Sequence, residues 1–352
     1  MRKIKKMTAA FLSMLMAFSL GACGSGSAGS DKKDVGKGAA GSEEVVSNIS
    51  TSVADSASGE VNMSVLEGLT VGFSQCDNSS NWKIIETESM QETAAEYGVN
   101  LIYTDASGNI AKQASDIEDM ISQGTDYIIV APQEEDGLQA ALISAKEAGI
   151  GVILVDRAIN GEPGVTYDTQ IMSDFVWEAN AVAEKIIETT GGKGNVAILE
   201  GTQGATSTID RQEGFMSAIE DTELNVIADQ VANYSMPEAQ EVMENILQAH
   251  GDELDVLYCH GCDMALGALA AIKAAGYTPG KDILIGTVDA SVDTMEALLA
   301  GEFLCAASCS PFFGPVTFEK IALMESGQTL EGEYINEDTL YTIENANVDE
   351  GF

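Results

Sequence analysis

The sequence predicts an α/β protein of two doubly wound lobes, each a parallel sheet with helices on both faces. Short apolar runs that suit buried parallel strands alternate with longer segments of helical spacing from Leu69 onward. Glycines stand where helix C-terminal glycines belong, shortly before the next apolar run. The alternation continues for too long to fit one small sheet, so we expect the chain to divide near Thr166–Ser173.

The expected elements follow one another in strict order. Strands are predicted at Leu69–Ser74, Val99–Tyr103, Tyr127–Ala131, Val152–Val155, Val196–Leu199, Val226–Val231, Val256–Tyr258 and Ile283–Thr287. Helices are predicted at Trp82–Tyr97, Ala111–Gln123, Gly137–Ala148, Phe175–Thr189, Thr208–Glu220, Pro237–Ala249 and Met264–Ala275. Ligands of such sheets bind beyond the carboxyl ends of the strands, so the residues that follow strands are the first candidates for a site.

The first 22 residues have the pattern of an export signal. A basic start precedes the apolar run Met7–Leu20, which is shorter than the ~20 residues of a membrane-spanning helix. The segment Leu20–Cys23 resembles the bacterial lipobox, whose cysteine carries a lipid. We therefore predict a signal peptide over 1–22 and lipid attachment at Cys23, which would hold the protein at the outer face of the cell membrane. The alternative is an ordinary signal peptide with Cys23 there by chance.

Residues 23–67 are predicted to form a disordered tether, because glycine, serine, alanine and scattered charge dominate them. Four of the 17 basic residues and none of the 56 acidic ones precede Cys23, so the remaining chain has 13 basic residues and a net charge of −43. Such a surface repels nucleic acid phosphates, which argues against a nucleic acid partner.

Polar side chains follow several of the predicted strands. They are Gln75–Trp82, Asp105, Asp156, Arg157, Arg211, His260–Asp263 and Asp289. Carboxylates and guanidinium groups that converge on a cleft can fix neutral hydroxyls. The face of Trp82 can pack on the apolar face of a sugar ring. The cleft is expected to be wet, so that replacing Arg211 or Asp289 should weaken binding and leave the fold largely intact.

Several motifs, in this order and spacing, resemble the type I periplasmic sugar-binding proteins of ABC importers, and within them the galactofuranose-binding branch that is related to the ribose binders. The resemblance covers about Leu69–Leu340. The motifs are VGFSQ with Asn81 and Trp82, ILVDR (Ile153–Arg157), SDF (Ser173–Phe175), EGTQG and DRQEGF (within Glu200–Phe215), DMALGALAAIKAAG (Asp263–Gly276), GKDILIGTVD (Gly280–Asp289) and SPFFGP (Ser310–Pro315).

The resemblance implies a fold with a three-strand hinge. It places residues 68–170 and 309–337 in one lobe, and 171–308 and 338–352 in the other. It also implies hinge closure on a small sugar, an ABC permease as partner, and a monomer without cofactor or metal. The implied ligand-binding residues are Trp82, Asp156, Arg157, Arg211 and Asp289; we add Lys83, where the family often has Arg, and Asp105.

This chain departs from the family pattern at several positions. Gly261-Cys262 replaces Asn-Asp, Ser308 and Ser79 replace acids, and Leu138 replaces a tryptophan. A missing partner in a buried site costs about 1–3 kcal/mol. We therefore expect a ligand other than galactofuranose or ribose in its usual pose, or a less hydroxylated one.

Five further cysteines, Cys76, Cys259, Cys262, Cys305 and Cys309, fall near strand ends. Free, partly buried thiols are the favoured interpretation, ahead of one disulfide and of a zinc site.

No nucleophile motif accompanies the two histidines, so an enzyme is not predicted. A LacI-type regulator would need a basic DNA-binding start in place of the export signal. A binding protein that signals to a membrane receptor remains the alternative to an import component.

Overall fold

The computed structural model describes residues 61–352, which belong to one compact unit. The predicted signal peptide, Cys23 and most of the predicted tether lie outside the described residues. Among the residues described, no helix is long and apolar enough to cross a membrane. The predicted tether boundary at residue 67 is too late, because Met63–Leu66 forms the 3-10 helix η1 and Leu66 is fully buried.

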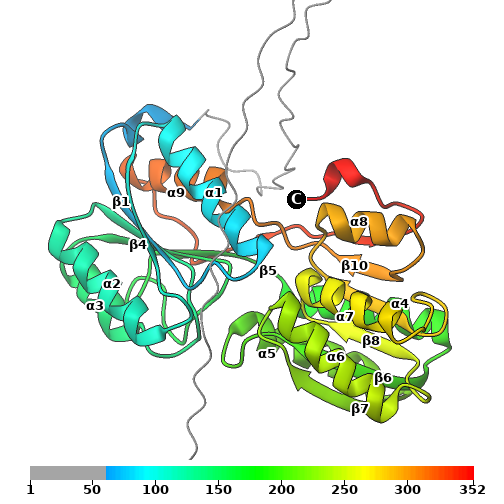
Figure 1. Cartoon of the computed structure of the whole chain (residues 1–352). Helices are drawn as coiled ribbons and strands as arrows, with labels where there is room; N and C mark the ends of the chain where they lie inside the picture. Colours follow the sequence, from blue (N-terminus) through cyan, green and yellow to red (C-terminus); the bar gives the residue numbers. More distant parts are fainter. Residues whose placement is uncertain (1–60) are drawn as a thin grey trace, which may run out of the picture. The chain divides into compact units, whose positions relative to one another are not determined.

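The first sheet has the strand order β11-β5-β4-β3-β1-β2, and all its neighbouring strands are parallel (Figure 1). Its strands are β1 (Thr70–Gln75), β2 (Asn100–Asp105), β3 (Tyr127–Val130), β4 (Gly151–Val155), β5 (Thr169–Ser173) and β11 (Glu333–Asn336). Helices α1 (Asn81–Glu96) and α9 (Phe313–Glu325) pack on one face, and α2 (Ile110–Gln123) and α3 (Gln139–Glu147) on the other. This part is lobe 1.

The second sheet has the order β12-β10-β9-β8-β6-β7, and only the pair β10–β12 is antiparallel. Its strands are β6 (Lys193–Glu200), β7 (Glu223–Val231), β8 (Val256–Cys259), β9 (Leu284–Val288), β10 (Cys305–Ala307) and β12 (Leu340–Thr342). Helices α4 (Phe175–Thr190) and α5 (Thr206–Ile219) cover one face. Helices α6 (Met236–His250), α7 (Cys262–Ala274) and α8 (Val292–Leu299) cover the other, and η2 (Val348–Glu350) follows β12. This part is lobe 2.

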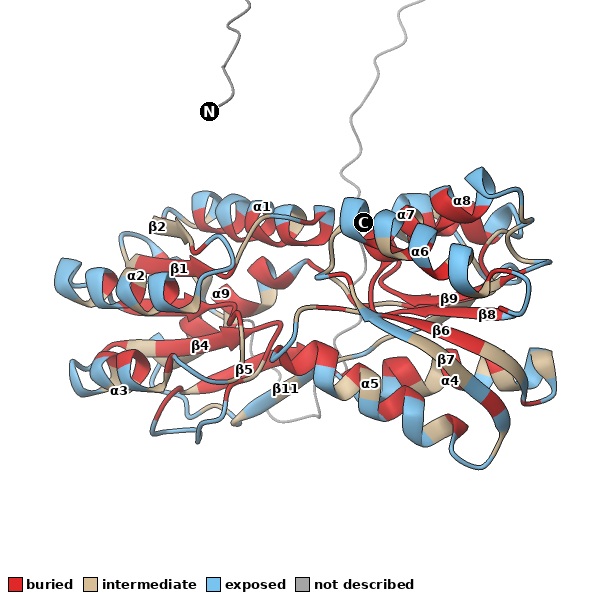
Figure 2. Ribbon diagram, turned by 60° about the horizontal axis from the view of Figure 1, so that its bottom comes forward, coloured by how far each residue is buried: buried red, intermediate tan, exposed pale blue. Residues whose placement is uncertain are grey.

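Both lobes bury their strands and expose the outer sides of their helices, as the colours of Figure 2 show. Alternate side chains of a strand enter different cores: Ile129 packs with α1 and α9, whereas Ile128 and Val130 pack with α2 and α3. A strand that is buried on both faces has a continuous run of apolar residues, and such runs can be recognised in the sequence. The prediction of two parallel-sheet α/β lobes is confirmed.

The chain passes between the two sheets three times: after β5, after β10, and between β11 and β12. We refer to these as the first, second and third passages. The first passage follows Ser173, so lobe 1 extends beyond the expected boundary at residue 170. The cysteines at 76, 259, 262, 305 and 309 are free and buried, and no described group of three or more His, Cys, Asp or Glu residues is arranged to hold a metal.

Candidate functional site

A partly enclosed cavity lies between the two lobes, at the carboxyl ends of the strands. Its lining residues are Asp77, Ser79, Ser80, Trp82, Lys83, Asp156, Arg157, Ser207, Arg211, Asn233, Tyr234, Gly261, Asp263, Met264, Asp289 and Cys309. The structure therefore brings together six of the seven residues that the sequence put forward as ligand-binding. This is the location that doubly wound sheets favour.

Trp82 enters the cavity from the first turn of α1. The helix begins after Ser80, whose hydroxyl accepts a hydrogen bond from the backbone N–H of Lys83. The Trp82 indole donates to the carbonyl of Cys309 at 2.8 Å and packs edge-to-face on Phe313. Because Cys309 lies on the second passage, the ring is fixed where the lobes join.

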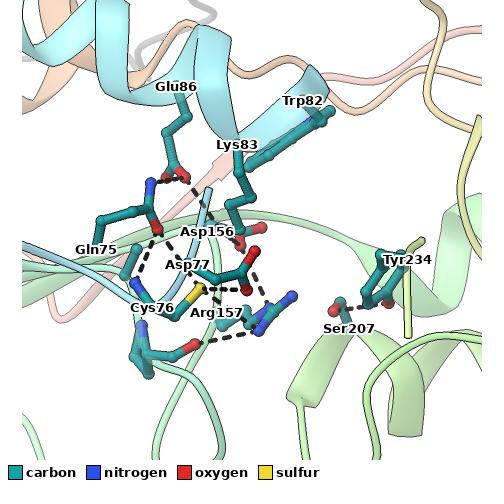
Figure 3. Close-up of polar contacts among 12 residues, drawn as sticks. Gln75, Cys76, Asp77, Trp82, Lys83, Glu86, Asp156, Arg157, Ser207 and Tyr234 are labelled. Atoms are coloured by element: carbon teal, nitrogen blue, oxygen red, sulfur yellow. Dashed lines mark hydrogen bonds and ion pairs between the residues drawn. The ribbon is translucent and has the colours of Figure 1, made fainter. Parts of the chain in front are cut away.

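Lys83 holds Asp156 by a buried ion pair, as Figure 3 shows. The Lys83 Nζ lies 2.6 Å from Asp156 Oδ2 and 3.0 Å from Glu86 Oε2, and Gln75 donates to the same Glu86 oxygen at 2.9 Å. Burial alone would lower the pKa of Lys83, but the nearby carboxylates raise it, so the ammonium stays charged. Its donors are mostly committed to Asp156 and Glu86, which makes Lys83 chiefly a positioning residue.

Arg157 and Tyr234 meet across the cavity from different lobes (Figure 3). The Arg157 guanidinium donates to the carbonyl of Gln133 at 3.1 Å and lies 5.5 Å from the centre of the Tyr234 ring. Its Nε atom is buried and makes no hydrogen bond within the described residues, but it forms an ion pair with Asp156 Oδ2 at 3.4 Å. Lys83 and Arg157 therefore share the Asp156 carboxylate.

Arg211 forms the opposite end of the cavity with two carboxylates. Its Nε donates to Glu178 at 2.8 Å, one Nη donates to the carbonyl of His260 at 2.6 Å, and the other lies 3.6 Å from Asp289 Oδ1. Asp289 follows β9 with a positive φ of 68°, and its Oδ2 accepts from the backbone N–H of Cys262. Burial raises the pKa of Asp289 to about 6 although Arg211 opposes the shift.

Two expectations for this site are wrong. Arg211 is only 3% exposed and Glu178 is fully buried, so Arg211 belongs to a buried ion-pair network and does not lie in a wet cleft. Asp105 does not line the cavity. Its carboxylate accepts a hydrogen bond from the Ser107 N–H at 2.6 Å, and it stabilises the turn after β2.

Tyr234 is a lining residue that the sequence reasoning missed. Tyr234 follows β7, so it lies at the carboxyl end of a strand like the other candidate residues. This position in the sequence is the signal that could have identified it. Its hydroxyl hydrogen-bonds with Ser207 at 2.9 Å and Thr208 at 3.1 Å. A Cβ atom on Gly261 would approach the ring to 3.0 Å, so the glycine leaves the space that the tyrosine occupies.

The two lobes make direct contacts around the cavity. The backbone N–H of Asn81 donates to Asp263 Oδ2 at 2.9 Å, and that of Glu135 donates to the carbonyl of Gly204 at 2.9 Å. These bonds join lobe 1 to lobe 2, so the structure is in a closed arrangement.

The pKa of Asp289 has a consequence for stability. Its ordinary value is 3.8 and burial raises it to about 6, so between these pH values the folded protein holds a proton that the unfolded chain has lost. The contribution of this group is full below pH 3.8 and is lost as the pH rises through about 6, an effect of roughly 2–3 kcal/mol. We expect the unfolding free energy of Asp289→Asn, measured by urea denaturation, to fall less between pH 4 and 7 than that of the wild type. Parallel pH curves for the two proteins would contradict this assignment.

The fold and the cavity define a class, that of two-lobed solute-binding proteins which enclose a ligand between α/β lobes. Residues 71–312 match the periplasmic binding protein domain family, to which the chain therefore belongs. The galactofuranose-binding protein YtfQ of Escherichia coli is 32% identical over 79% of this chain and 89% of its own length. The ribose import binding protein RbsB of Bacillus subtilis is 33% identical over 65% of this chain and 72% of its own.

Solved structures of solute-binding proteins are similar to this chain in fold and sequence. The binding protein of the arabinose ABC transporter from Shewanella, bound to arabinofuranose, has a TM-score of 0.76 and 34% identity over 79% of this chain and 93% of that one. A galactofuranose-binding protein has a TM-score of 0.76 and 33% identity over 80% and 97%. The family and these relatives are solute-binding proteins, which confirms the prediction that the chain is not an enzyme.

Proposed function

We propose that this protein captures a small sugar or sugar-like polyol between its lobes and delivers it to an ABC permease. The observation that carries the proposal is the cavity itself, in which Asp156 and Arg157 of lobe 1 face Arg211 and Asp289 of lobe 2. Arginines offer paired donors and carboxylates offer acceptors to hydroxyl groups, while Trp82 offers an aromatic face to a ring.

The cavity supports a ligand whose hydroxyls are arranged differently from those of the family's usual pentoses and hexoses. Gly261 brings no polar side chain to the lining, and the Tyr234 ring occupies the adjacent space. Ser79 and Ser308 bring no carboxylate, and Cys262 offers only a weakly hydrogen-bonding thiol. Asp77 and Asp263 nevertheless bring carboxylates to the lining, beside Asp156 and Asp289, so the acceptors lie at other places than in the family pattern and would satisfy a different set of hydroxyls.

The proposal extends to the whole chain. Residues 68–170 and 309–337 would move as one body and 171–308 and 338–352 as the other, with small shifts of these boundaries to the ends of β5 and β10, and closure about the three passages would trap the ligand. A lipid on Cys23 would hold a monomer at the outer face of the membrane. Delivery to a receptor instead of a permease is the second possibility; the genes beside this one, for a permease and ATPase or for a histidine kinase, distinguish the two.

Calorimetry with D-galactose, D-ribose, L-arabinose, xylitol and the deoxy sugar D-fucose tests the proposal. We expect one of them to saturate a single site and, at 100 times its Kd, to stabilise the fold by about 2.7 kcal/mol. The amides of Asn81 and Glu135 bond across the lobes, so hydrogen exchange at both should slow when the sugar binds. Heat and exchange that stay unchanged with every sugar and polyol tried would refute sugar binding.

A further inference from the structure

One carboxylate of lobe 2 bonds to the N-terminus of the first helix of lobe 1. Asp263 lies in the first turn of α7, and its Oδ2 accepts a hydrogen bond at 2.9 Å from the backbone N–H of Asn81, the first residue of α1. Burial raises the pKa of the Asp263 carboxyl above its ordinary value, while the N–H groups of Asn81 and Trp82 act in the opposite direction. Backbone donors of lobe 1 therefore stabilise a charge that belongs to lobe 2.

The N-terminus of α1 needs such a partner. The first N–H groups of a helix find no acceptor within the helix itself, and this end of the helix is positive. In α1 the Ser80 hydroxyl accepts from the N–H of Lys83, and the sequence NWKI of the first turn contains no acid. The N–H of Asn81 takes its acceptor from the other lobe. Asp263 supplies that acceptor together with a negative charge.

The first N–H of α7 has a different acceptor, so Asp263 is available to α1. The backbone N–H of Cys262 donates to Asp289 Oδ2 at 3.2 Å. Both helices begin at the cavity, since Trp82 and Asp263 line it from their first turns. The charge of Asp263 thus lies where the positive ends of two helices from different lobes meet, and it offsets their repulsion.

We propose that Asp263 is a positioning residue for ligand capture, whose bond to the N–H of Asn81 is a latch that forms when the lobes close and holds them closed around the ligand. This inference rests on the proposed function, because it supposes that the lobes open and close. The donor belongs to lobe 1 and the acceptor to lobe 2, so opening of the cavity separates them and returns both to water. The latch therefore stabilises the closed arrangement alone, and its loss lowers the affinity for the ligand.

Asn81→Pro tests the latch without changing any residue that lines the cavity. Asn81 is exposed and is the first residue of α1, a position that proline suits because its missing N–H has no acceptor within the helix. The preceding Ser80 already has the extended conformation that a following proline requires, with φ −114° and ψ 157°. The variant removes the donor for Asp263 and keeps the helix. Asn81→Ala is the matched control, because it loses the side chain but retains the N–H.

The Kd is measured by calorimetry with whichever of L-arabinose, D-ribose and D-galactose saturates the wild type. We expect Asn81→Pro to raise the Kd roughly 5- to 50-fold and Asn81→Ala to leave it within about twofold, because hydrogen bonds to charged groups are the strong ones. Most of the loss should appear as faster dissociation of the sugar in stopped-flow measurements, since the latch forms after the sugar has entered. Equal Kd values for the two variants would overturn the latch and leave the proposed function intact.

A double-mutant cycle with Asp263→Ala separates the latch from a direct contact of Asp263 with the sugar. Asp263 lines the cavity, so Asp263→Ala alone weakens binding in either case. If the two residues act through their shared bond, Asn81→Pro should cost nothing further once residue 263 is alanine. A proline effect of the same size in both backgrounds would mean that proline acts by another route, and the proposal would fail.

Hydrogen exchange of the ligand-free protein tests the latch even if no sugar binds and the proposed function falls. The amide of Glu135 reports closure at a second point, because it donates across the lobes to the carbonyl of Gly204. We expect it to exchange faster in Asn81→Pro and in Asp263→Ala than in Asn81→Ala, since both changes shift the lobes toward the open arrangement. The Asp263→Ala comparison decides the matter if the proline variant does not fold. Equal exchange in all these proteins would rule the latch out.

Discussion

Arg211→Met is expected to lower the unfolding free energy by about 3–5 kcal/mol and to abolish ligand binding. Methionine retains much of the arginine stem but leaves the fully buried Glu178 and the nearly buried Asp289 without their cation. Breaking one partner of a buried ion pair is costly because the remaining charge cannot reach water. The His260 carbonyl also loses its donor at 2.6 Å. His260 offers no replacement cation, since burial lowers its pKa to about 3.

Urea denaturation at pH 7 measures this effect, with two comparisons. Lys112→Met removes an exposed helical ion pair with Asp116 and should change the unfolding free energy by at most about 0.5 kcal/mol. Arg211→Met combined with Glu178→Gln should recover part of the loss, because the amide does not carry a charge. A loss below about 1 kcal/mol in the single variant would show that Arg211 lies in a hydrated cleft after all.

The second large effect is expected from Lys83→Met, at about 3–5 kcal/mol of unfolding free energy together with a loss of sugar binding. The Lys83 side chain is nearly buried, and its removal leaves Asp156 and Glu86 facing each other without the ammonium that joins them. Asp156 stands at a positive φ of 64°, so the ion pair also holds a strained backbone that presents Arg157 to the cavity.

Lys83→Arg is the informative partner of this variant. Arginine keeps the positive charge, so most of the unfolding free energy should be retained. Its guanidinium donors are arranged differently from an ammonium, so they would hold Asp156 in a different position. If Lys83→Met bound the sugar with unchanged affinity in folded protein, Asp156 would need no support and the assigned role of Lys83 would be wrong. Calorimetry on protein that circular dichroism shows to be folded separates binding from folding.

The sequence alone determined the class of fold and most of the elements, but not β5, β10, β11, β12, α8 or α9. Apolar runs such as Val152–Val155 and Val256–Tyr258 became strands because they suit a strand buried on both faces and are too short for a buried helix. Candidate residues at strand ends largely converged on the cavity, because parallel strands carry their carboxyl ends to one edge of a sheet. These are local rules that act within a few residues, so they can be read without the tertiary structure.

Non-local packing decided the rest. The strands β10 and β12 span only three residues each, too few for a period to show, and they exist because neighbouring strands pair with them. Whether Asp105 stabilises a turn or meets a ligand depends on the path of the chain after β2. Arg211 lies in a buried network and Asp338 meets Ser308 because segments distant in sequence pack together. Sequence spacing does not encode the burial that sets the pKa of these groups, since burial arises only when segments distant in sequence pack around them.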